Sequence, residues 1–334
     1  MKANVVVVNP EHPEMEIIQQ AAEIVQTGGL VAFPTETVYG LGANALETEA
    51  VAKIFQAKGR PSHNPLIVHV PGVAFAKQLV CEWPKLADRL AEQFWPGSLT
   101  LVLTKAKTVP ANVTANGPTV AIRVPSHPVA LALLRQATVP IAAPSANKSN
   151  RLSPTCADHV ALDLGGEVDL ILDGGPCPGG LESTVLDVTT YPPRLLRPGL
   201  VTPSQIENLV GPIEVVGERI DETDTLRSPG MLDKHYAPRT PLELVEGDAK
   251  ERVKELNSRG LEVGWLRFGK KIQDRPSGVV IEQMSAEPKA YAATLYAALH
   301  RCDAEGLSII VLELPPRSED WLAVHDRLRR AAGK

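Results

Sequence analysis

Cations and hydroxyl groups fall in short motifs that could bind an anion. Lys58 and Arg60 flank a glycine and precede a proline, between an expected helix and an expected strand. Lysine supplies a point charge, and arginine supplies a planar fork that suits phosphate or carboxylate. A solvated turn is the other interpretation, because cations are favourable beside the C-terminus of any helix. The motif by itself leaves both interpretations open.

A second motif, residues 33–42 (FPTETVYGLG), combines hydroxyls with glycines after an expected strand. Its two glycines, with Ala45, formally match the dinucleotide-binding fingerprint, which needs an acidic residue about 20 positions further on. The chain has Pro-Ser-His-Asn-Pro at residues 61–65 instead. We therefore expect a polar loop that presents Thr35 and Thr37 to a ligand, with a tight turn of no function as the alternative.

Two polar residues interrupt apolar runs and are therefore expected to be buried. Arg123 lies in Ala-Ile-Arg-Val-Pro, and a buried arginine needs an anionic partner. No carboxylate stands near it in the sequence, so we expect the carboxylate of a ligand as its partner. His69, inside the apolar residues 66–70, is by itself more typical of a hydrogen-bonded core histidine than of a catalytic one.

Small polar residues and glycines follow further apolar stretches. Ser145 and Asn147 come directly after an apolar run, and ligands of open α/β sheets bind at the ends of strands. Two glycine pairs ahead of Ser183 offer backbone N–H groups to an anion, and Arg197 adds another cation. Each of these features could also be a surface turn without function.

Composition and missing motifs exclude several classes of protein. A net charge of −5 and 4% aromatic residues argue against a protein that coats or stacks on nucleic acid. No P-loop, HExxH or GxSxG motif occurs, and no His, Asp and Glu cluster has metal-ligand spacing, so any Mg²⁺ would be held mainly by ligand phosphates. The four cysteines form no C-x-x-C pair, and the four valines near the N-terminus are too short for a signal peptide or a membrane span. We expect a cytoplasmic protein with reduced cysteines.

The periodicity of the first part of the chain predicts an α/β domain. Apolar runs typical of strands covered on both faces occur at residues 5–8, 30–33, 66–70, 99–104, 119–124, 170–172 and 184–188. Helical patterns lie between several of them, at residues 14–27, 47–57, 84–94 and 127–136. Ser126 is the expected N-cap of the last helix. Because the alternation becomes imperfect after residue 95, we expect a mixed sheet.

The pattern breaks after residue 210 and resumes near residue 241. We assign residues 10–210 to the first domain, residues 211–240 to an interdomain linker and residues 241–332 to a second domain. The linker includes a charged stretch at residues 217–227. The second domain alternates strand and helix patterns, which predicts a smaller three-layer α/β domain of the open-sheet, Rossmann-like type.

Taken together, these motifs resemble the YrdC-like family in its long, two-domain form. The family's order is kept by residues 34–41 (PTETVYGL), 58–61 (KGRP), 64–66 (NPL), 145–147 (SAN), 183–185 (STV) and 197–199 (RPG). Residues 228–231 (SPGM) and 235–238 (HYAP) match the linker of the long form. Each motif is weak alone, but their shared order is specific. The resemblance implies a YrdC-like twisted mixed sheet with flanking helices, followed by the smaller domain.

The resemblance also implies a reaction, that of an ATP-dependent nucleotidyltransferase. L-threonine, bicarbonate and ATP, with Mg²⁺, would give threonylcarbamoyl-AMP and pyrophosphate, for threonylcarbamoyladenosine modification of tRNA beside the anticodon. Several anionic groups then share one site, so positioning and charge neutralisation are the main tasks. As partners, the resemblance implies transient contact with tRNA-modifying threonylcarbamoyltransferase proteins, with no membrane and no stable binding of nucleic acid.

Residue roles follow from the same resemblance. Those expected to hold L-threonine are Thr35, His69, Arg123 on the carboxylate, the Ala143 backbone and Ser183. Those expected to hold ATP are Lys58, Arg60, Ser62, Thr119, Ser145, Asn147, Ser153, Arg197 and Tyr236. Lys58 and Arg60 are also the expected catalytic residues, Tyr236 is expected to cover the nucleotide as a lid, and no residue is expected to ligate a metal directly. Asn150 stands where the family has glycine, but asparagine also tolerates left-handed backbone.

Three other functions compete with this interpretation. An RNA-binding module would share a concave, partly basic face, but the charge and the few aromatic residues argue against it. Carbamoyl transfer in metallocentre maturation belongs to related domains of larger proteins, whose acylphosphatase-like and Cys-rich segments this chain lacks. A regulatory nucleotide or amino-acid binder would hold the same ligands and release no pyrophosphate.

Overall fold

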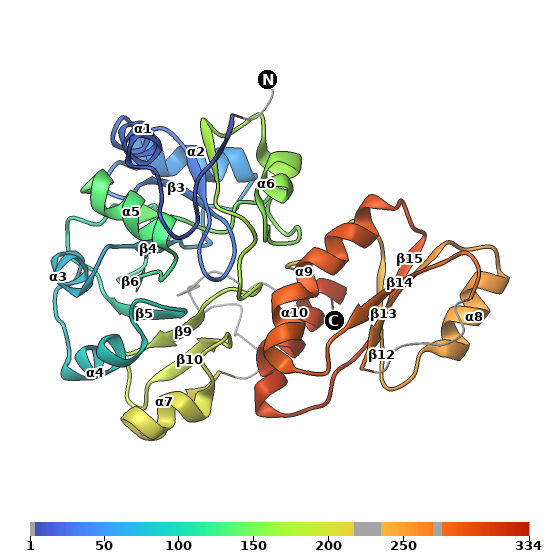
Figure 1. The fold of residues 1–334 in the computed structure, drawn as a ribbon. Coiled ribbons are helices and arrows are strands. Elements are labelled where there is room, and N and C mark those ends of the chain that lie inside the picture. The colour runs from blue at the N-terminus through green and yellow to red at the C-terminus, as the bar shows by residue number, and fades with distance from the viewer. Residues whose placement is uncertain (1–3, 217–234, 270–275, 334) are drawn as a thin grey trace. The chain divides into compact units, whose positions relative to one another are not determined.

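The computed structural model describes residues 4–216, 235–269 and 276–333. The chain divides into two compact units. The first comprises Met1–Ser149, Pro154–Pro178 and Glu182–Met231, and the second comprises Asn150–Ser153, Gly179–Leu181 and Leu232–Lys334. In Figure 1 the first unit runs from blue to yellow, and the second is mainly orange and red.

The first unit is built on one mixed sheet of eleven strands, in the order β1-β8-β2-β3-β7-β4-β6-β5-β9-β10-β11. The strands are β1 (Val5–Val7), β2 (Val31–Phe33), β3 (Gly40–Asn44), β4 (Ile67–His69), β5 (Leu99–Thr104), β6 (Thr119–Arg123), β7 (Ile141–Ala142), β8 (Leu170–Asp173), β9 (Thr184–Asp187), β10 (Arg194–Arg197) and β11 (Glu214–Val215). Strands β4 and β6 are parallel, whereas β7 runs antiparallel to both β3 and β4. The expected mixed sheet is confirmed.

Helices cover both faces of this sheet. The helices are α1 (Met15–Gln26), α2 (Thr48–Lys58), α3 (Val73–Ala76), α4 (Lys85–Phe94), α5 (Pro128–Ala137), α6 (Ala157–Leu164) and α7 (Pro203–Val210). Successive strand residues face opposite sides, so Val31 and Phe33 pack with α1 and α5, and Ala32 packs with α2, α4 and α6. Both faces are therefore apolar, which explains why the strands read as continuous apolar runs.

Strand β3 differs from the sequence prediction, which placed a polar loop there. All five of its residues are buried, and it pairs antiparallel with β2. A Cβ added at Gly42 would lie 2.7 Å from both the Ile141 Cγ2 and the Phe33 Cε1 atoms. The glycines of this motif therefore allow close packing between strands, and they do not form a dinucleotide-binding turn.

Two backbone positions tested local predictions. Ser126 is not the N-cap of α5, because His127 occupies that position and its Nδ1 accepts a hydrogen bond from the Val129 N–H at 3.2 Å. The helix begins at Pro128, one residue later than a cap at Ser126 would place it. Asn150 has φ of +66°, so the left-handed conformation expected for this glycine substitute is confirmed.

The second unit contains a parallel sheet of four strands in the order β12-β15-β13-β14. Its elements are β12 (Leu242–Val245), α8 (Lys250–Ser258), β13 (Val263–Phe268), β14 (Val279–Met284), α9 (Pro288–Ala304), β15 (Ile309–Glu313) and α10 (Leu322–Ala332). One part of its core lies between α8 and the sheet, where Val253 and Leu256 pack with Trp265. A small open-sheet α/β domain was predicted, and the parallel sheet with helices confirms it.

Most of the linker predicted at residues 211–240 lies outside the described residues, which omit 217–234. That gap contains the charged stretch and the motif at 228–231. At its two described ends, β11 pairs in parallel with β10 in the first unit, and the Ala237 N–H donates to the Asn150 carbonyl at 3.0 Å within the second unit.

Candidate functional site

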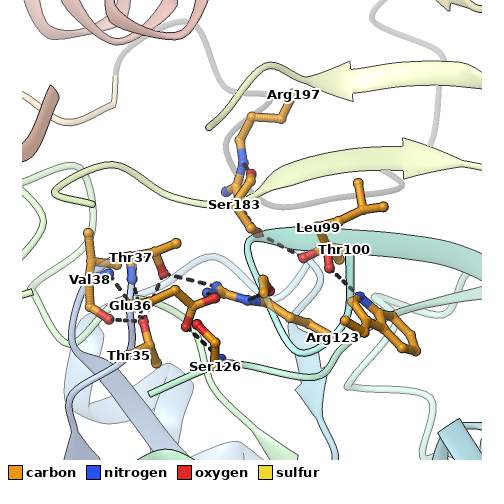
Figure 2. A network of polar contacts seen from close by, with 12 residues as sticks. Thr35, Glu36, Thr37, Val38, Leu99, Thr100, Arg123, Ser126, Ser183 and Arg197 are labelled. Carbon is orange, nitrogen blue, oxygen red and sulfur yellow. Dashed lines mark hydrogen bonds and ion pairs between the residues drawn. The ribbon is translucent and has the colours of Figure 1, made fainter. Parts of the chain in front are cut away.

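Two adjacent parallel strands, β4 and β6, end in buried polar residues. His69 ends β4 and lies directly opposite Arg123, which ends β6. The Arg123 Nε donates to the Gly97 carbonyl at 3.1 Å. Its Nη1 donates to the Thr37 hydroxyl (3.0 Å) and its Nη2 to the Glu36 carboxylate (2.6 Å), and Figure 2 shows these residues together. No carboxylate stands near Arg123 in the sequence, so this protein partner was not predicted. Glu36 stands 87 residues away in the chain, and the fold brings the two together.

Glu36 also connects two loops of the site. Its Oε1 accepts from Arg123, and its Oε2 accepts from the backbone N–H of Ser126 at 3.1 Å. Ser126 lies between β6 and α5, whereas Glu36 lies between β2 and β3. The Arg123 and Glu36 side chains are 4% and 14% exposed, so this is a largely buried ion pair. Removing one partner would leave the other's charge buried and uncompensated.

A chain of hydroxyl groups extends from Arg123 into the loop after β2. The Thr35 hydroxyl donates to the Val38 carbonyl at 2.6 Å, so its oxygen must accept in the 2.8 Å contact with the Thr37 hydroxyl. Thr37 therefore donates to Thr35 and accepts from Arg123. The hydrogen bonds in such a chain polarise one another, which strengthens them and fixes the positions of the hydroxyl groups. The Thr35 hydroxyl also accepts from the Thr37 and Val38 backbone N–H groups, so it organises this loop.

His69 is buried beside Arg123. Burial, followed by the nearby charge of Arg123, lowers the pKa of His69 from 6.5 to about 3, so its imidazole is neutral at neutral pH. Its Nδ1 has no hydrogen-bond partner among the described residues. Buried polar atoms are usually paired, so an unpartnered Nδ1 beside Arg123 marks a place for a ligand group or a water molecule.

A second polar cluster joins β9, β10 and β5. The Arg197 Nε donates to the Ser183 carbonyl at 3.0 Å, and its Nη2 donates to the Ser183 hydroxyl at 3.1 Å. That hydroxyl contacts the Thr100 hydroxyl at 2.8 Å (Figure 2). Gly199 allows this approach, because a Cβ there would lie 2.3 Å from the Thr184 backbone nitrogen. The structure thus brings the predicted residues Ser183 and Arg197 together.

Lys58 holds the loop that contains two other predicted residues. It ends α2, and its Nζ donates to the carbonyl oxygens of Ser145 (2.5 Å) and Asn147 and to the Asn147 Oδ1 (3.3 Å). The Ser145 hydroxyl donates to the same Oδ1 at 2.6 Å. Burial, and then the charge of Arg60, lower the pKa of Lys58 well below its ordinary value. The structure therefore brings Lys58, Ser145 and Asn147 together.

Arg60 is also buried by its own turn. Its Nε donates to the Asn64 carbonyl (3.1 Å), and its Nη2 donates to the Asn64 Oδ1 (2.5 Å) and the Pro65 carbonyl (2.8 Å). Lys58 and Arg60 are 3% and 7% exposed, so the solvated-turn interpretation of this motif is wrong. Both cations order backbone around them.

The remaining predicted residues lie in different settings. Ser62 is exposed, and Thr119 begins β6 at the opposite end of the strand from Arg123. The backbone N–H of Ala143 donates to the Ile67 carbonyl at 2.9 Å. Ser153 belongs to the second unit, where its carbonyl contacts the His300 ring at 3.2 Å.

Tyr236, the predicted lid, also belongs to the second unit. It is 1% exposed and has φ of +61°. Its ring stacks on Tyr296 at 6.0 Å between centroids, and the Arg327 guanidinium lies 5.1 Å from its centroid. This contact is one that the sequence did not indicate, because Arg327 lies far along the chain on α10.

The described parts of the chain show neither a metal-binding cluster nor a membrane-spanning helix. Across these residues, no three His, Cys, Asp or Glu side chains come together in a way that could hold a metal ion. No helix among them combines the length and apolar character needed to cross a membrane. The four cysteines carry free thiols.

Comparison with known proteins places this geometry in a family. The Sua5_yciO_yrdC family model ("Telomere recombination") matches residues 23–199, and the model "Threonylcarbamoyl-AMP synthase, C-terminal domain" matches residues 201–333. The threonylcarbamoyl-AMP synthase of Bacillus subtilis is 46% identical over 323 residues, which cover 95% of this chain and 93% of the relative. The chain belongs to the threonylcarbamoyl-AMP synthase family.

Relatives within the threonylcarbamoyl-AMP synthase family extend across domains of life. The synthase of Pyrococcus abyssi is 43% identical over 95% of this chain and 94% of its own length. The crystal structure of Pyrococcus abyssi Sua5 complexed with L-threonine superimposes with a TM-score of 0.91 and 41% identity, covering 98% of this chain and 97% of that one. The fold of this family member is therefore that of the two-domain synthases.

Sequence reasoning missed two residues that the structure places in the network. Glu36 stands within the PTETVYGL motif but received no role, and Thr100 lies within an apolar strand. An acidic residue between two threonines in a family motif was the available signal for Glu36. For Thr100 the only signal was a hydroxyl residue inside the strand at residues 99–104.

Proposed function

We propose that this chain makes threonylcarbamoyl-AMP and pyrophosphate from L-threonine, bicarbonate and ATP. The observation that carries the proposal is the match over nearly the whole chain, in sequence and fold, to Pyrococcus abyssi Sua5, which was solved with L-threonine. The nucleotidyl transfer to a carbamate is the step that distinguishes such an enzyme from a protein that only binds threonine and a nucleotide.

The proposed reaction accumulates negative charge. Bicarbonate supplies CO₂ with loss of hydroxide, and the threonine amine attacks the carbon of CO₂ to form a carbamate. The proton that the amine gives up combines with the hydroxide to form water. A carbamate oxygen then attacks the α-phosphorus of ATP, and the bond to pyrophosphate breaks. The carboxylate, the carbamate and the phosphates are all anionic, so the protein must mainly position them and neutralise their charge.

The ends of β4 and β6 support a threonine site. Arginine has five N–H groups, and Arg123 uses two of them on the neutral acceptors Gly97 and Thr37, so the other three, including the one paired with Glu36, can serve a substrate carboxylate. His69, its register partner, adds the unpartnered Nδ1, which can hydrogen-bond the amine or hydroxyl of threonine. The backbone carbonyl of Ala143 is proposed as a further acceptor for the amine.

For ATP, we infer an indirect role for Lys58 and Arg60. Their donors order the loop of Ser145 and Asn147 and the turn around Asn64, while their charges favour phosphate binding nearby. Cations and hydroxyls dominate these clusters, which suits phosphate oxygens better than a metal ion. Magnesium therefore enters this proposal only as the counter-ion that ATP brings with it.

We further infer that the product serves modification of tRNA in the cytoplasm. An acyl-adenylate of a carbamate is activated toward nucleophiles, so it must reach the accepting adenosine before water hydrolyses it. A tRNA-modifying threonylcarbamoyltransferase is the class of partner that would consume it.

Pyrophosphate release tests the proposal. The full chain is incubated with MgATP, and release is compared with L-threonine and bicarbonate together, each alone, and neither. We expect release only when both are present. Release without L-threonine would indicate another substrate, and binding of ATP without release would indicate a regulatory binder instead.

A further inference from the structure

The Glu36 carboxylate is ion-paired with Arg123, the residue that the proposed function assigns to the substrate carboxylate. Its Oε1 lies 2.6 Å from the Arg123 Nη2, which is the distance of a strong charge-assisted hydrogen bond. The other two acceptors of Arg123, the Gly97 carbonyl and the Thr37 hydroxyl, are neutral. Glu36 is therefore the group in this network that carries the same charge as a substrate carboxylate.

Glu36 and a substrate carboxylate would compete for the single positive charge of Arg123. Arg123 supplies one positive charge, and its side chain is 4% exposed, so water screens it poorly. His69 is neutral and supplies none. If a substrate carboxylate joined Glu36 on the same guanidinium, two carboxylates would face one buried cation, and their mutual repulsion would be poorly screened even though the substrate's ammonium balances the net charge.

Glu36 has a route by which it can leave. Its side chain is 14% exposed, more than that of Arg123, and its second anchor is a single backbone hydrogen bond from Ser126. Releasing that bond and the ion pair would let the carboxylate turn toward water while Arg123 keeps its bonds to Gly97 and Thr37. The arginine would then stay in place for the incoming group.

We propose that Glu36 is the resident counter-ion of Arg123, which a carboxylate substrate must displace, and that it thereby selects which anions the site accepts. This inference rests on the proposed function, because it concerns the same threonine site. An attached carboxylate competes intramolecularly, so it is present at high effective concentration. An incoming anion can displace it only if it also gains other contacts.

The selection matters because the second substrate is itself an anion. Bicarbonate resembles a carboxylate in charge and shape, and it would bind an uncompensated Arg123. It offers no amine or side chain for His69, so Glu36 excludes it. L-threonine combines a carboxylate with an amine and a hydroxyl, and these supply the additional contacts that displacement needs.

Calorimetric titration of L-threonine into the wild type and Glu36→Gln, without ATP and bicarbonate, tests the proposal. Glutamine keeps the size of the side chain and one oxygen acceptor but removes the charge. We expect L-threonine to bind Glu36→Gln about tenfold more tightly, a typical size for coupling between two ligand groups. Turnover of this variant should also become inhibited by bicarbonate in competition with L-threonine. Equal or weaker binding of L-threonine would overturn the proposal.

A matched control removes a carboxylate from an ion pair elsewhere in the same unit. Glu214 pairs with Arg194 at 3.3 Å at the edge of the sheet, where both side chains are partly exposed. Glu214→Gln should bind L-threonine as the wild type does. Titration of ATP into each variant reports whether the rest of the site is intact.

Acetate tests the counter-ion role without relying on threonine chemistry. Glu36→Ala leaves Arg123 without its anion, so sodium acetate should raise the melting temperature of this variant more than sodium chloride of equal ionic strength. The two salts should act alike on the wild type. Equal effects on the variant would contradict the proposal, and if this variant does not fold, the titration of Glu36→Gln decides.

The two claims can fail separately. If wild-type protein releases no pyrophosphate while acetate still stabilises Glu36→Ala, the proposed function falls and the counter-ion stands. If the wild type turns over as proposed while Glu36→Gln binds L-threonine no more tightly, only the counter-ion role is lost.

Discussion

Lys58 and Arg123, two buried cations, differ in how many N–H donors remain available to a ligand. The ammonium group of Lys58 has three N–H groups, and three oxygen atoms of the Ser145–Asn147 loop accept from them. Arg123 has five and uses three. At the scale of single residues, Arg123 is therefore suited to direct contact with a substrate, and Lys58 to holding a loop that makes such contacts.

Arg123→Lys should separate the two substrates. Lysine keeps a positive charge opposite Glu36 but lacks the fork that a carboxylate binds in two places, so we expect the KM for L-threonine to rise at least about tenfold. The KM for ATP should stay within about twofold, because the phosphate side of the site uses other residues. Steady-state kinetics with each substrate varied in turn measure both values. Unchanged KM for L-threonine would remove Arg123 from the threonine site.

His69 gives a pH dependence of stability whose sign can be worked out. Its pKa is about 3 in the folded chain and 6.5 ordinarily, so below pH 6.5 the unfolded chain binds a proton that the folded chain does not. This contribution to stability is fully present above pH 6.5 and is lost as the pH falls toward 3. Between pH 7.5 and 5 the loss is about 2 kcal/mol.

Urea denaturation of the wild type and His69→Gln at pH 7.5 and pH 5 checks this sign. The free energy of unfolding should fall more steeply in the wild type than in the variant, by about 2 kcal/mol over the interval. Parallel curves would mean that His69 is solvated or already protonated in the folded protein.

The residues of the site were only partly predictable from the sequence. Arg123 and His69 stood out because polar residues within apolar runs are unusual, and both end buried strands. Their relation to Glu36 could not be predicted, because that ion pair joins residues 87 positions apart. One sequence carries no signal for such a distance, which depends on how β6 and the loop after β2 are placed in the sheet.

Among the elements, β3 determines how the PTETVYGL motif is presented. It pairs with β2 on one side and β7 on the other, so the loop between β2 and β3 is held at both ends by the sheet. The sequence missed this strand because its glycines are typical of turns. Here they are needed for packing instead, since side chains of β2 and β7 fill the space beside Gly42.

Gly42→Ala tests the packing of β3. The added methyl would lie 2.7 Å from the Phe33 ring, so it must shift buried neighbours, and we expect destabilisation of about 1–3 kcal/mol in chemical denaturation. Gly166→Ala is the control, because nothing lies within 4 Å of a Cβ at that exposed position. Equal stability of the two variants would contradict the close packing described for β3.

Other elements were predictable where periodicity and end signals agreed. Helices α1, α2, α4 and α5 follow apolar periodicity and begin within one residue of their expected bounds. Helix α7 was missed although Thr202 and Gln205 form a capping box and Pro203 begins the helix. Only Ile206 of this short helix is buried, so its apolar pattern was too weak to detect.

At the scale of the whole molecule, the chain forms two units, and predicted nucleotide-binding residues belong to both. Tyr236 and Ser153 are in the second unit, whereas Lys58, Asn147 and Arg197 are in the first. The break in the strand and helix pattern indicated a division near residue 210, but it could not show that Asn150–Ser153 would be part of the second unit. That assignment arises from contacts such as Ala237 with Asn150, which join distant parts of the chain.

Tyr236→Ala should change the use of ATP if this residue serves the nucleotide. Loss of the ring also removes the stacking on Tyr296 and the contact with Arg327, so we expect the KM for ATP to rise about fivefold. Tyr236→Phe keeps the ring and should resemble the wild type. Wild-type kinetics in Tyr236→Ala would remove Tyr236 from the nucleotide site.

Detection of the reaction product decides whether this chain carries out the proposed synthesis. The full chain is incubated with MgATP, L-threonine and ¹³C-bicarbonate, and the mixture is analysed at once by mass spectrometry. We expect threonylcarbamoyl-AMP that carries the ¹³C label, formed in step with pyrophosphate. Pyrophosphate with an adduct that lacks either threonine or the label would contradict it, as would bound substrates that remain unchanged.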